Sequence, residues 1–229
     1  MPYRLVAFDF DGTLADSFAF FLGALGEVAR EHRFRAPAPE EVPLLRQCST
    51  REVMRRLQVP AWKLPAVARS FMGRMQHSSQ RVPLFPGSAE LLRTLAAHQV
   101  PLALVTSNAR VNVEAVLGPQ LMALFAHVDC GASILGKAPR LRRLARRAAV
   151  PGGQVLYIGD QGADAEAAHH AGMAFGAVTW GYATPEALAQ AGPRHLFGEM
   201  RHIAEVVLGL PPAQPAAPDS DSKAATQLA

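Results

Sequence analysis

Two aspartates, Asp9 and Asp11, stand one residue apart where an apolar run that begins at Leu5 comes to an end. Because side chains of an extended chain alternate between its two faces, both carboxylates are expected on the same side of the strand end. Two such anions about 4 Å apart repel by about 4 kcal/mol at an effective dielectric of about 20. The pair is therefore expected either to hold a cation or to lie exposed to solvent without a role.

Polar side chains follow two further apolar runs, at the point where each run ends. The runs lie at residues 101–106 and 154–159, and their composition is typical of strands buried in a parallel sheet. Ligands of open α/β sheets bind beyond the carboxyl ends of the strands, so these side chains are expected to meet Asp9 and Asp11 in one crevice. The residues concerned are Thr106, Ser107, Asn108, Asp160 and Asp164.

Lys137 is a further candidate for the crevice, beside the polar residues that follow the three apolar runs. Pro139 suits the first turn of a helix, so Lys137 is expected beside the positive end of a helix dipole, where a cation is disfavoured by about 0.3 to 1 kcal/mol. Lysine supplies only three of the 23 basic residues, and at this place it indicates a compact charge directed at an anion. Carboxylates, an ammonium group and hydroxyls together fit a divalent hard cation plus a phosphate.

The elements that must position these residues follow from the alternation of apolar runs and amphipathic patterns. Strands rich in Val, Leu and Ile that alternate with helices predict an α/β fold with a doubly wound, mainly parallel, Rossmann-like sheet covered on both faces. The predicted strands begin at Leu5, Pro101, Phe125, Gln154 and Ala174. The predicted helices begin near Ser88, Arg110, Ala138 and Ala163.

One interval, residues 17–82, is far longer than an ordinary connection between a strand and a helix. Its patterns predict three helices, over 17–32, from Thr50 with Ser49 or Thr50 as the cap, and over about 61–80. We therefore expect a helical cap at 17–82 inserted into a catalytic core. The core would comprise residues 1–16 and 83–210, and residues 211–229, poor in large apolar side chains, are expected to form a disordered tail.

The segments DFDGT, VTSN, GK and GDQGAD occur in this order, and together they resemble the motifs of the haloacid dehalogenase-like hydrolase superfamily. Within it, the sequence is similar to the phosphoglycolate phosphatase-like branch, which carries a helical cap between the first and second motifs. The resemblance covers Tyr3 to about Leu210. It implies a Mg²⁺-dependent phosphatase acting on a small phosphorylated metabolite, with phosphoglycolate as the nearest example.

The same resemblance implies a role for each polar residue. Asp9 would be the nucleophile that takes the phosphoryl group, and Asp11 the general acid and then the general base, with its backbone carbonyl on the metal. Lys137 would hold phosphate oxygens and also steady Asp9. The expected metal ligands are Asp9, Asp11, Asp160 and Asp164, the last directly or through water. The expected phosphate ligands are Thr106, Ser107, Asn108 and Lys137.

Other functions and substrates remain open at this point. A sugar-phosphate mutase would differ only in which acceptor reaches Asp9, and a binding or regulatory module could use the same fold without catalysis. Substrate choice is expected to reside in the cap, where Arg46 and Arg51 are candidates for binding an anionic group of the substrate. The metabolite itself is not identified by any motif.

Composition limits the remaining function classes. Hydrophobic residues make up 49% and charged residues 18% of the 229 residues, which is typical of a globular protein without a membrane span. Two cysteines, Cys48 and Cys130, form no disulfide framework, so a reducing cytoplasmic setting is expected. We expect a monomer or a homodimer.

A basic segment follows Lys137 and accounts for part of the formal charge of +4. Its apolar residues fall on one stripe of a helix, and Arg140, Arg143 and Arg147 share the other side, where they are expected to be solvated. No aromatic or glycine-rich nucleic-acid signature accompanies them, so a nucleic-acid partner is not expected.

Overall fold

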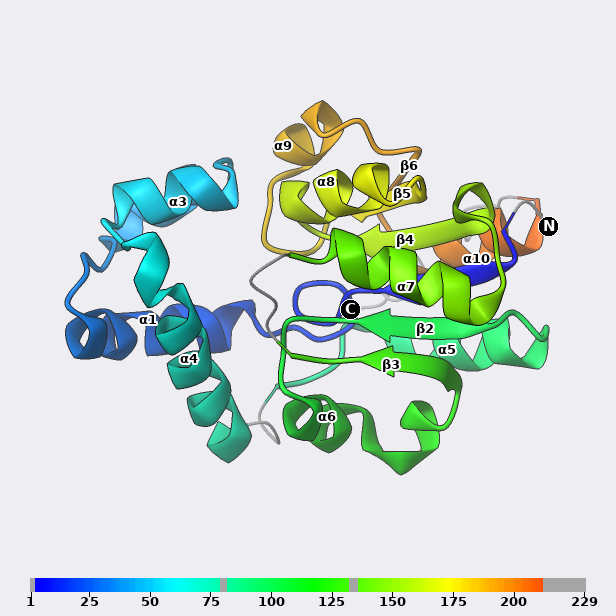
Figure 1. The fold of residues 1–229 in the computed structure, drawn as a ribbon, viewed down its shortest axis with the longest axis horizontal. Helices are drawn as coiled ribbons and strands as arrows, with labels where there is room; N and C mark the ends of the chain where they lie inside the picture. Colours follow the sequence, from blue (N-terminus) through cyan, green and yellow to red (C-terminus); the bar gives the residue numbers. More distant parts are fainter. Residues whose placement is uncertain (1–2, 79–81, 132–135, 212–229) are drawn as a thin grey trace, which may run out of the picture.

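The computed structural model describes residues 3–78, 82–131 and 136–211, and within them six parallel strands form a single sheet in the order β3-β2-β1-β4-β5-β6. The predicted fold class is confirmed (Figure 1). The strand order reverses at β1, which pairs with β2 on one side and with β4 on the other. The strands are β1 (Leu5–Phe8), β2 (Leu102–Val105), β3 (Phe125–Asp129), β4 (Val155–Gly159), β5 (Ala174–Val178) and β6 (His195–Phe197).

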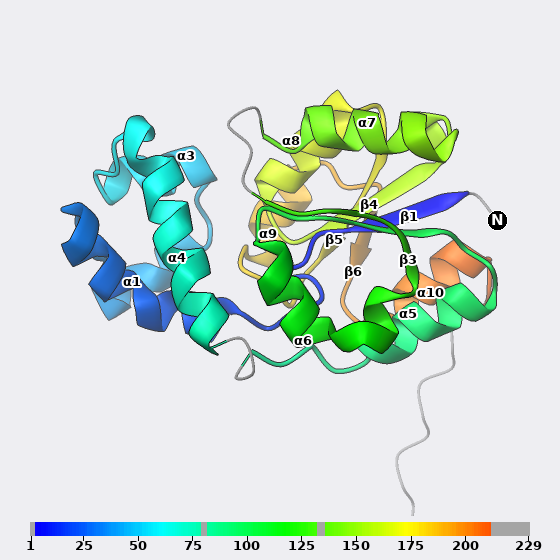
Figure 2. The same cartoon turned by 60° about the horizontal axis from the view of Figure 1, so that its bottom comes forward.

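Helices cover both faces of the sheet, as Figure 2 shows. Alternate residues of each strand face opposite layers, so Val6 and Phe8 of β1 belong to one apolar cluster while Leu5 and Ala7 belong to the other. The first cluster is closed by α5 (Ser88–Ala97), α6 (Arg110–Met122) and α10 (Met200–Leu208). The second is closed by α7 (Ala138–Ala148), α8 (Gly162–His170) and α9 (Pro185–Gln190).

The strand β6 was not predicted from the sequence. Its three residues offer too short a pattern for period-two alternation to be recognised. It is held at the sheet edge by pairing with β5, with Gly176 opposite His195 and Val178 opposite Phe197. A Cβ on Gly176 would come within 2.7 Å of the Phe197 ring, so the small residue in β5 makes room for the aromatic side chain of β6.

The prediction that Arg140 lies on a solvated helix face was wrong. Its side chain is buried, and it donates to the backbone carbonyls of Thr106 at 3.0 Å, Asp129 at 2.6 Å and Gly131 at 2.6 Å. It also pairs with the Asp129 carboxylate at 2.9 Å. A helical pattern shows which side is apolar, but it does not show that a neighbouring strand end presents free carbonyls to one arginine. Arg143 and Arg147 are exposed on α7, as predicted.

The interval between β1 and α5 is helical, and its helices form a lobe beside the carboxyl ends of the strands in both views (Figures 1 and 2). Ser49 caps α3 as predicted, since its Oγ accepts from the Glu52 N–H at 3.2 Å. The domain boundaries at residues 16 and 83 stay predictions. The helices are α1 (Phe18–His32), α2 (Val42–Leu45), α3 (Thr50–Arg56) and α4 (Leu64–Ser78), with short 3₁₀ turns at Pro39–Glu41, Ala61–Lys63 and, in the core, Gly152–Gln154.

Two chain crossings join this helical lobe to the sheet, and they run side by side. The Asp16 N–H donates to the Pro83 carbonyl at 2.9 Å, and the Phe85 N–H donates to the Leu14 carbonyl at 2.9 Å. Ser88 Oγ also donates to the Leu14 carbonyl, at 3.0 Å. The predicted tail lies outside the described residues except for Pro211. Within the described part of the chain, every helix is too short or too polar to cross a bilayer.

Candidate active site

The turn after β1 brings the first aspartates to the middle of the carboxyl edge. Asp9 directly follows β1 and is 4% exposed. Gly12 has a φ of +75°, and a Cβ at that position would lie 2.1 Å from Oδ2 of Asp160. Because L side chains disfavour this backbone conformation and no space is available, the turn requires glycine. The close approach places the β1 turn directly against the end of β4.

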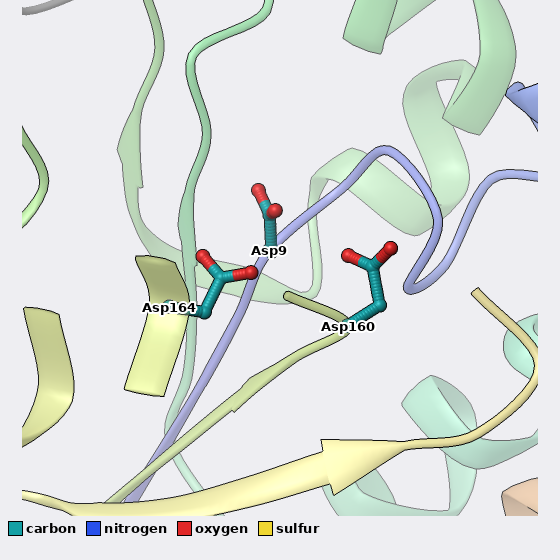
Figure 3. Close-up of side chains that lie close together, drawn as sticks. All are labelled: Asp9, Asp160 and Asp164. Carbon is teal, nitrogen blue, oxygen red and sulfur yellow. The ribbon is translucent and has the colours of Figure 1, made fainter. Parts of the chain in front are cut away.

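Three buried carboxylates gather at this edge, from the ends of β1 and β4 and from the start of α8 (Figure 3). One oxygen from each of Asp9, Asp160 and Asp164 lies within 4.8 Å of the others. Asp160 is held in place by Thr13 Oγ1 at 3.2 Å and by the Tyr182 N–H at 2.7 Å. Asp164 accepts from the Gln161 N–H and the Tyr157 hydroxyl, both at 3.2 Å.

Lys137 lies immediately before α7, as predicted, and joins two of these carboxylates. Its Nζ is 2.7 Å from Asp9 Oδ2 and 2.7 Å from Asp164 Oδ1. Burial alone would lower the pKa of Lys137, but the carboxylates of Asp164 and Asp9 raise it well above its ordinary value. The ammonium group is therefore charged at neutral pH and provides a fixed cation beside Asp9.

The carboxylates themselves are hard to ionise in this setting. Burial raises the pKa of Asp9 from 3.8 to about 7, against the opposing attraction of Lys137. Burial, with repulsion from Asp164 and Asp9, raises the pKa of Asp160 well above its ordinary value. One ammonium does not balance three clustered carboxylates, so the site has an excess of negative charge. A hard divalent cation bound by oxygen ligands would remove that excess, and the donor set fits Mg²⁺.

The stability of the protein in a chelator is expected to fall as pH rises from about 4 to about 7. The unfolded chain releases the Asp9 proton near the ordinary value, whereas the folded chain keeps it until the raised pKa of about 7. Between these values the folded state binds more protons, so a rising pH favours unfolding. Thermal melts in EDTA should show a steeper decline for the native chain than for Asp9→Asn. Parallel curves, or a native melting temperature that rises over this interval, would contradict the expectation.

Asp11 lies beside the cluster without joining it. Among the described residues, the group that could share an ion contains the other three aspartates and not the Asp11 side chain. Asn108 Nδ2 donates to Asp11 Oδ2 at 2.9 Å. Burial raises the pKa of Asp11, opposed by hydrogen bonds from Ser17 and Asn108. A carboxyl group with a raised pKa is suited to donate a proton near neutral pH. The prediction that the Asp11 backbone carbonyl binds metal stays a prediction.

The segment after β2 lies at the same edge. Thr106 is 1% exposed, and its Oγ1 accepts from the Asn108 N–H at 3.0 Å. Ser107 is exposed and lines a cavity of about 420 Å³ together with Lys137 and Asp164. This space is here called the catalytic cavity because it reaches Lys137, although Asp9 and Asp160 are not on its wall. Gln161 and Thr50 are on its wall. The phosphate contacts predicted for residues 106–108 stay predictions.

The two cap arginines have different surroundings. Arg46 lies against the core, where its Nε donates to the Tyr182 carbonyl at 2.9 Å and an Nη donates to the Gly181 carbonyl at 3.0 Å. Arg51 is exposed on α3. The guanidinium of Arg46 is therefore partly occupied by backbone acceptors, and its predicted contact with a substrate anion stays a prediction.

Several residues that shape the site were missed by sequence reasoning. Tyr182 orients Asp160 through its backbone N–H, and Asn112 donates to Asn108 Oδ1 at 2.9 Å and to the Met72 carbonyl at 3.0 Å. Arg140 binds the Thr106 carbonyl from behind. Backbone donors leave no side-chain signal in a sequence. For Asn112 a signal did exist, since it stands in the first turn of the helix predicted to begin near Arg110, only four positions after Asn108.

Comparison with known proteins identifies the family to which this arrangement belongs. The model of the haloacid dehalogenase-like hydrolases matches residues 6–178, which include all the clustered aspartates and Lys137. The chain belongs to the haloacid dehalogenase-like hydrolase family. The resemblance drawn from the motifs is thereby confirmed, and the chain is an enzyme of the hydrolase class.

Individual relatives support the same assignment. A phosphoglycolate phosphatase of Synechococcus elongatus is 32% identical over 208 residues, which is 90% of this chain and 98% of the relative. A phosphoglycolate phosphatase of Chromobacterium violaceum is 30% identical over 200 residues, 81% of this chain and 89% of the relative. A haloacid dehalogenase-like hydrolase structure from Streptococcus pneumoniae has a TM-score of 0.74 at 17% identity, covering 90% of this chain and 99% of its own. The structural likeness supports the fold alone.

Proposed function

We propose that this hydrolase is a Mg²⁺-dependent phosphatase that cleaves a small phosphorylated metabolite through an aspartyl-phosphate on Asp9. The observation that carries the proposal is the position of Lys137, whose Nζ is 2.7 Å from both Asp9 and Asp164 at the edge of a buried carboxylate cluster. Such an arrangement combines a nucleophile, a fixed cation and a set of oxygen ligands within one crevice.

The proposed reaction has two proton-balanced steps. In the first, an oxygen of Asp9 bonds to phosphorus while the bond from phosphorus to the leaving oxygen breaks, and Asp11 gives its proton to that oxygen. In the second, Asp11 takes a proton from water, whose oxygen bonds to phosphorus as the Asp9 oxygen leaves. Inorganic phosphate and the alcohol are released. Lys137 holds the Asp9 oxygen that it already contacts, and its charge attracts the phosphoryl oxygens.

The metal would be held by Asp9, Asp160 and the backbone carbonyl of Asp11, with Asp164 as a ligand directly or through water. When bound, Mg²⁺ supplies positive charge that neutralises the carboxylates and the transferring phosphoryl group. Thr13 and the Tyr182 N–H keep the Asp160 carboxylate in one orientation. We propose that Thr106, Ser107 and Asn108 donate to the remaining phosphate oxygens.

Phosphoglycolate is the first substrate to test, because two relatives that match most of this chain are named phosphoglycolate phosphatases. Purified protein should release inorganic phosphate from at least one member of a phosphometabolite panel in Mg²⁺, and EDTA should stop the release. The panel includes sugar phosphates, and the products show whether phosphate reaches water or returns to the sugar, as a mutase would require. Absence of phosphate release from every ester would refute the proposal.

Asn112 is expected to act as a positioning residue for Asp11. It donates to Asn108 Oδ1, which leaves the Asn108 Nδ2 group turned toward Asp11. Asn112→Leu should lower kcat for an alkyl phosphate about tenfold, a fraction of what a general acid contributes. The loss for p-nitrophenyl phosphate should be smaller, because its leaving group needs no proton. Asn108→Ala should show the same selectivity on top of a loss common to both substrates, because Asn108 is also a proposed phosphate ligand. Equal losses on both substrates, or a lowered melting temperature alone, would indicate only a structural role.

A further inference from the structure

A second cavity, here called the cap chamber, lies between the cap helices and the core, on the side of α1 and α3. It has a volume of about 240 Å³ and a wall made largely of apolar side chains. Leu22, on this wall, is 40% exposed. The principal apolar residues of the wall are Phe18, Phe21, Leu22, Val53, Leu57 and Phe71.

The chamber offers little to a charged ligand. Among the described residues that line it, Arg46 is the single charged one. Two of its nitrogens already donate hydrogen bonds to the Gly181 and Tyr182 carbonyls. Its guanidinium carbon lies 5.1 Å from the centre of the Phe18 ring. A carboxylate placed inside would lose water and compete for an arginine that is already engaged. Burying an anion without a dedicated partner is costly.

The chamber adjoins the catalytic cavity. Thr50 of α3 and Gln161 of the core line both spaces. Gln161 also donates its N–H to Asp164, at 3.2 Å. A phosphate ester bound beside Lys137 could therefore extend its organic part past Thr50 and Gln161 into the chamber. The phosphoryl group and the leaving group would occupy neighbouring compartments of opposite polarity.

We propose that the cap chamber binds an uncharged, apolar leaving group, with the size of an aromatic ring or a short branched alkyl chain. The inference rests on the proposed phosphatase function, for which it names a substrate class. An apolar cavity of about 150 Å³ is enough to hold benzene, so the chamber is large enough for such a group. Phosphoglycolate would leave most of the chamber unfilled and would bring a carboxylate against its apolar wall.

Binding of non-hydrolysable phosphonates tests the chamber independently of turnover. Titration calorimetry with the Mg²⁺-loaded native protein should show benzylphosphonate binding at least about tenfold more tightly than methylphosphonate, because the ring leaves water when it enters the apolar chamber. Phosphonoacetate, which carries a carboxylate, should bind more weakly than benzylphosphonate. Equal affinities for the benzyl and methyl compounds would overturn the proposal. Tighter binding of phosphonoacetate would also overturn it and would support the predicted anion contact of Arg46.

A matched pair of cap variants tests whether the preference for benzylphosphonate arises in the chamber. Val53→Phe places a ring in the chamber and should reduce the ratio of benzylphosphonate to methylphosphonate affinity toward one. Leu44→Phe makes the same kind of change at a side chain that is 45% exposed and outside the chamber, and it should leave the ratio as in the native protein. A ratio that Val53→Phe does not change would place the ring elsewhere and overturn the assignment.

Hydrolysis rates distinguish a failure of the chamber proposal from a failure of the proposed phosphatase function. The native protein should hydrolyse benzyl phosphate with a kcat/KM at least about tenfold that for ethyl phosphate, on the same burial argument. If the enzyme hydrolyses small esters but does not prefer benzyl over ethyl phosphate, the chamber proposal fails while the phosphatase proposal stands. If no ester is hydrolysed, the phosphatase proposal fails, and the phosphonate affinities still decide whether the chamber binds apolar groups.

Discussion

Asp9→Asn should reduce kcat by a factor of at least about 10⁴, because loss of the nucleophile in a hydrolase with a covalent intermediate costs on the order of 10⁶. The change keeps the size of the side chain and removes one negative charge from a group whose pKa burial already raises to about 7. The fold should therefore survive, and the melting temperature in EDTA should not fall. Phosphate release under saturating substrate and Mg²⁺ is the measurement.

The control for this experiment is Asp16→Asn. Asp16 belongs to the same stretch of chain but is exposed, so the same chemical change there should leave kcat within about twofold, as expected for a surface substitution. Asp9→Asn protein that keeps more than a small fraction of native turnover would show that another group attacks phosphorus. Residual activity must be checked for deamidation, which restores the aspartate.

Asp160→Asn should lower kcat/KM by at least about 10³-fold, because electrostatic stabilisation is usually the largest single contribution to such catalysis. The amide is a weaker ligand for a hard cation, and the carboxylate it replaces is fixed by Thr13 and the Tyr182 N–H. In EDTA the variant should be as stable as the native protein or more so, because burial and two neighbouring carboxylates disfavour the charged form of Asp160.

Addition of Mg²⁺ should further distinguish Asp160→Asn from the native protein. Native protein should gain thermal stability as Mg²⁺ is added, by about 2.7 kcal/mol when the free ion is at about 100 times its dissociation constant. Asp160→Asn should gain much less at the same concentration, whereas Glu186→Gln, at an exposed position on α9, should respond as the native protein does. An identical response of Asp160→Asn and native protein would contradict Asp160 as a ligand.

Local pattern was sufficient to predict five of the six strands of the sheet and the place of the site. Buried parallel strands are nearly continuous apolar runs, so β1, β2 and β4 and the polar residues after them can be recognised in the sequence. Because parallel strands share one carboxyl edge, Asp9, Asp160 and Lys137 were expected together, and the structure brings them together.

Contacts that depend on distant segments could not be predicted in the same way. Arg140 looks like any other arginine of a basic helix, but the ends of β2 and β3 present carbonyls to it and it becomes buried. Arg46 binds the carbonyls of Gly181 and Tyr182, more than 130 positions away in the chain. The apolar chamber depends on how α1 and α3 lie against the core, which no periodicity encodes.

The attack of Asp9 on phosphorus can be tested directly by trapping the acyl phosphate. Native protein mixed with an excess of a hydrolysable ester and Mg²⁺ is quenched in acid during turnover and treated with sodium borohydride, which reduces an acyl phosphate to the alcohol. Peptide mass spectrometry should then find homoserine in place of aspartate at position 9, and only when the ester is present. Reduction at Asp11 or Asp160 instead, or unmodified Asp9 in protein shown to be turning over, would contradict the proposed mechanism.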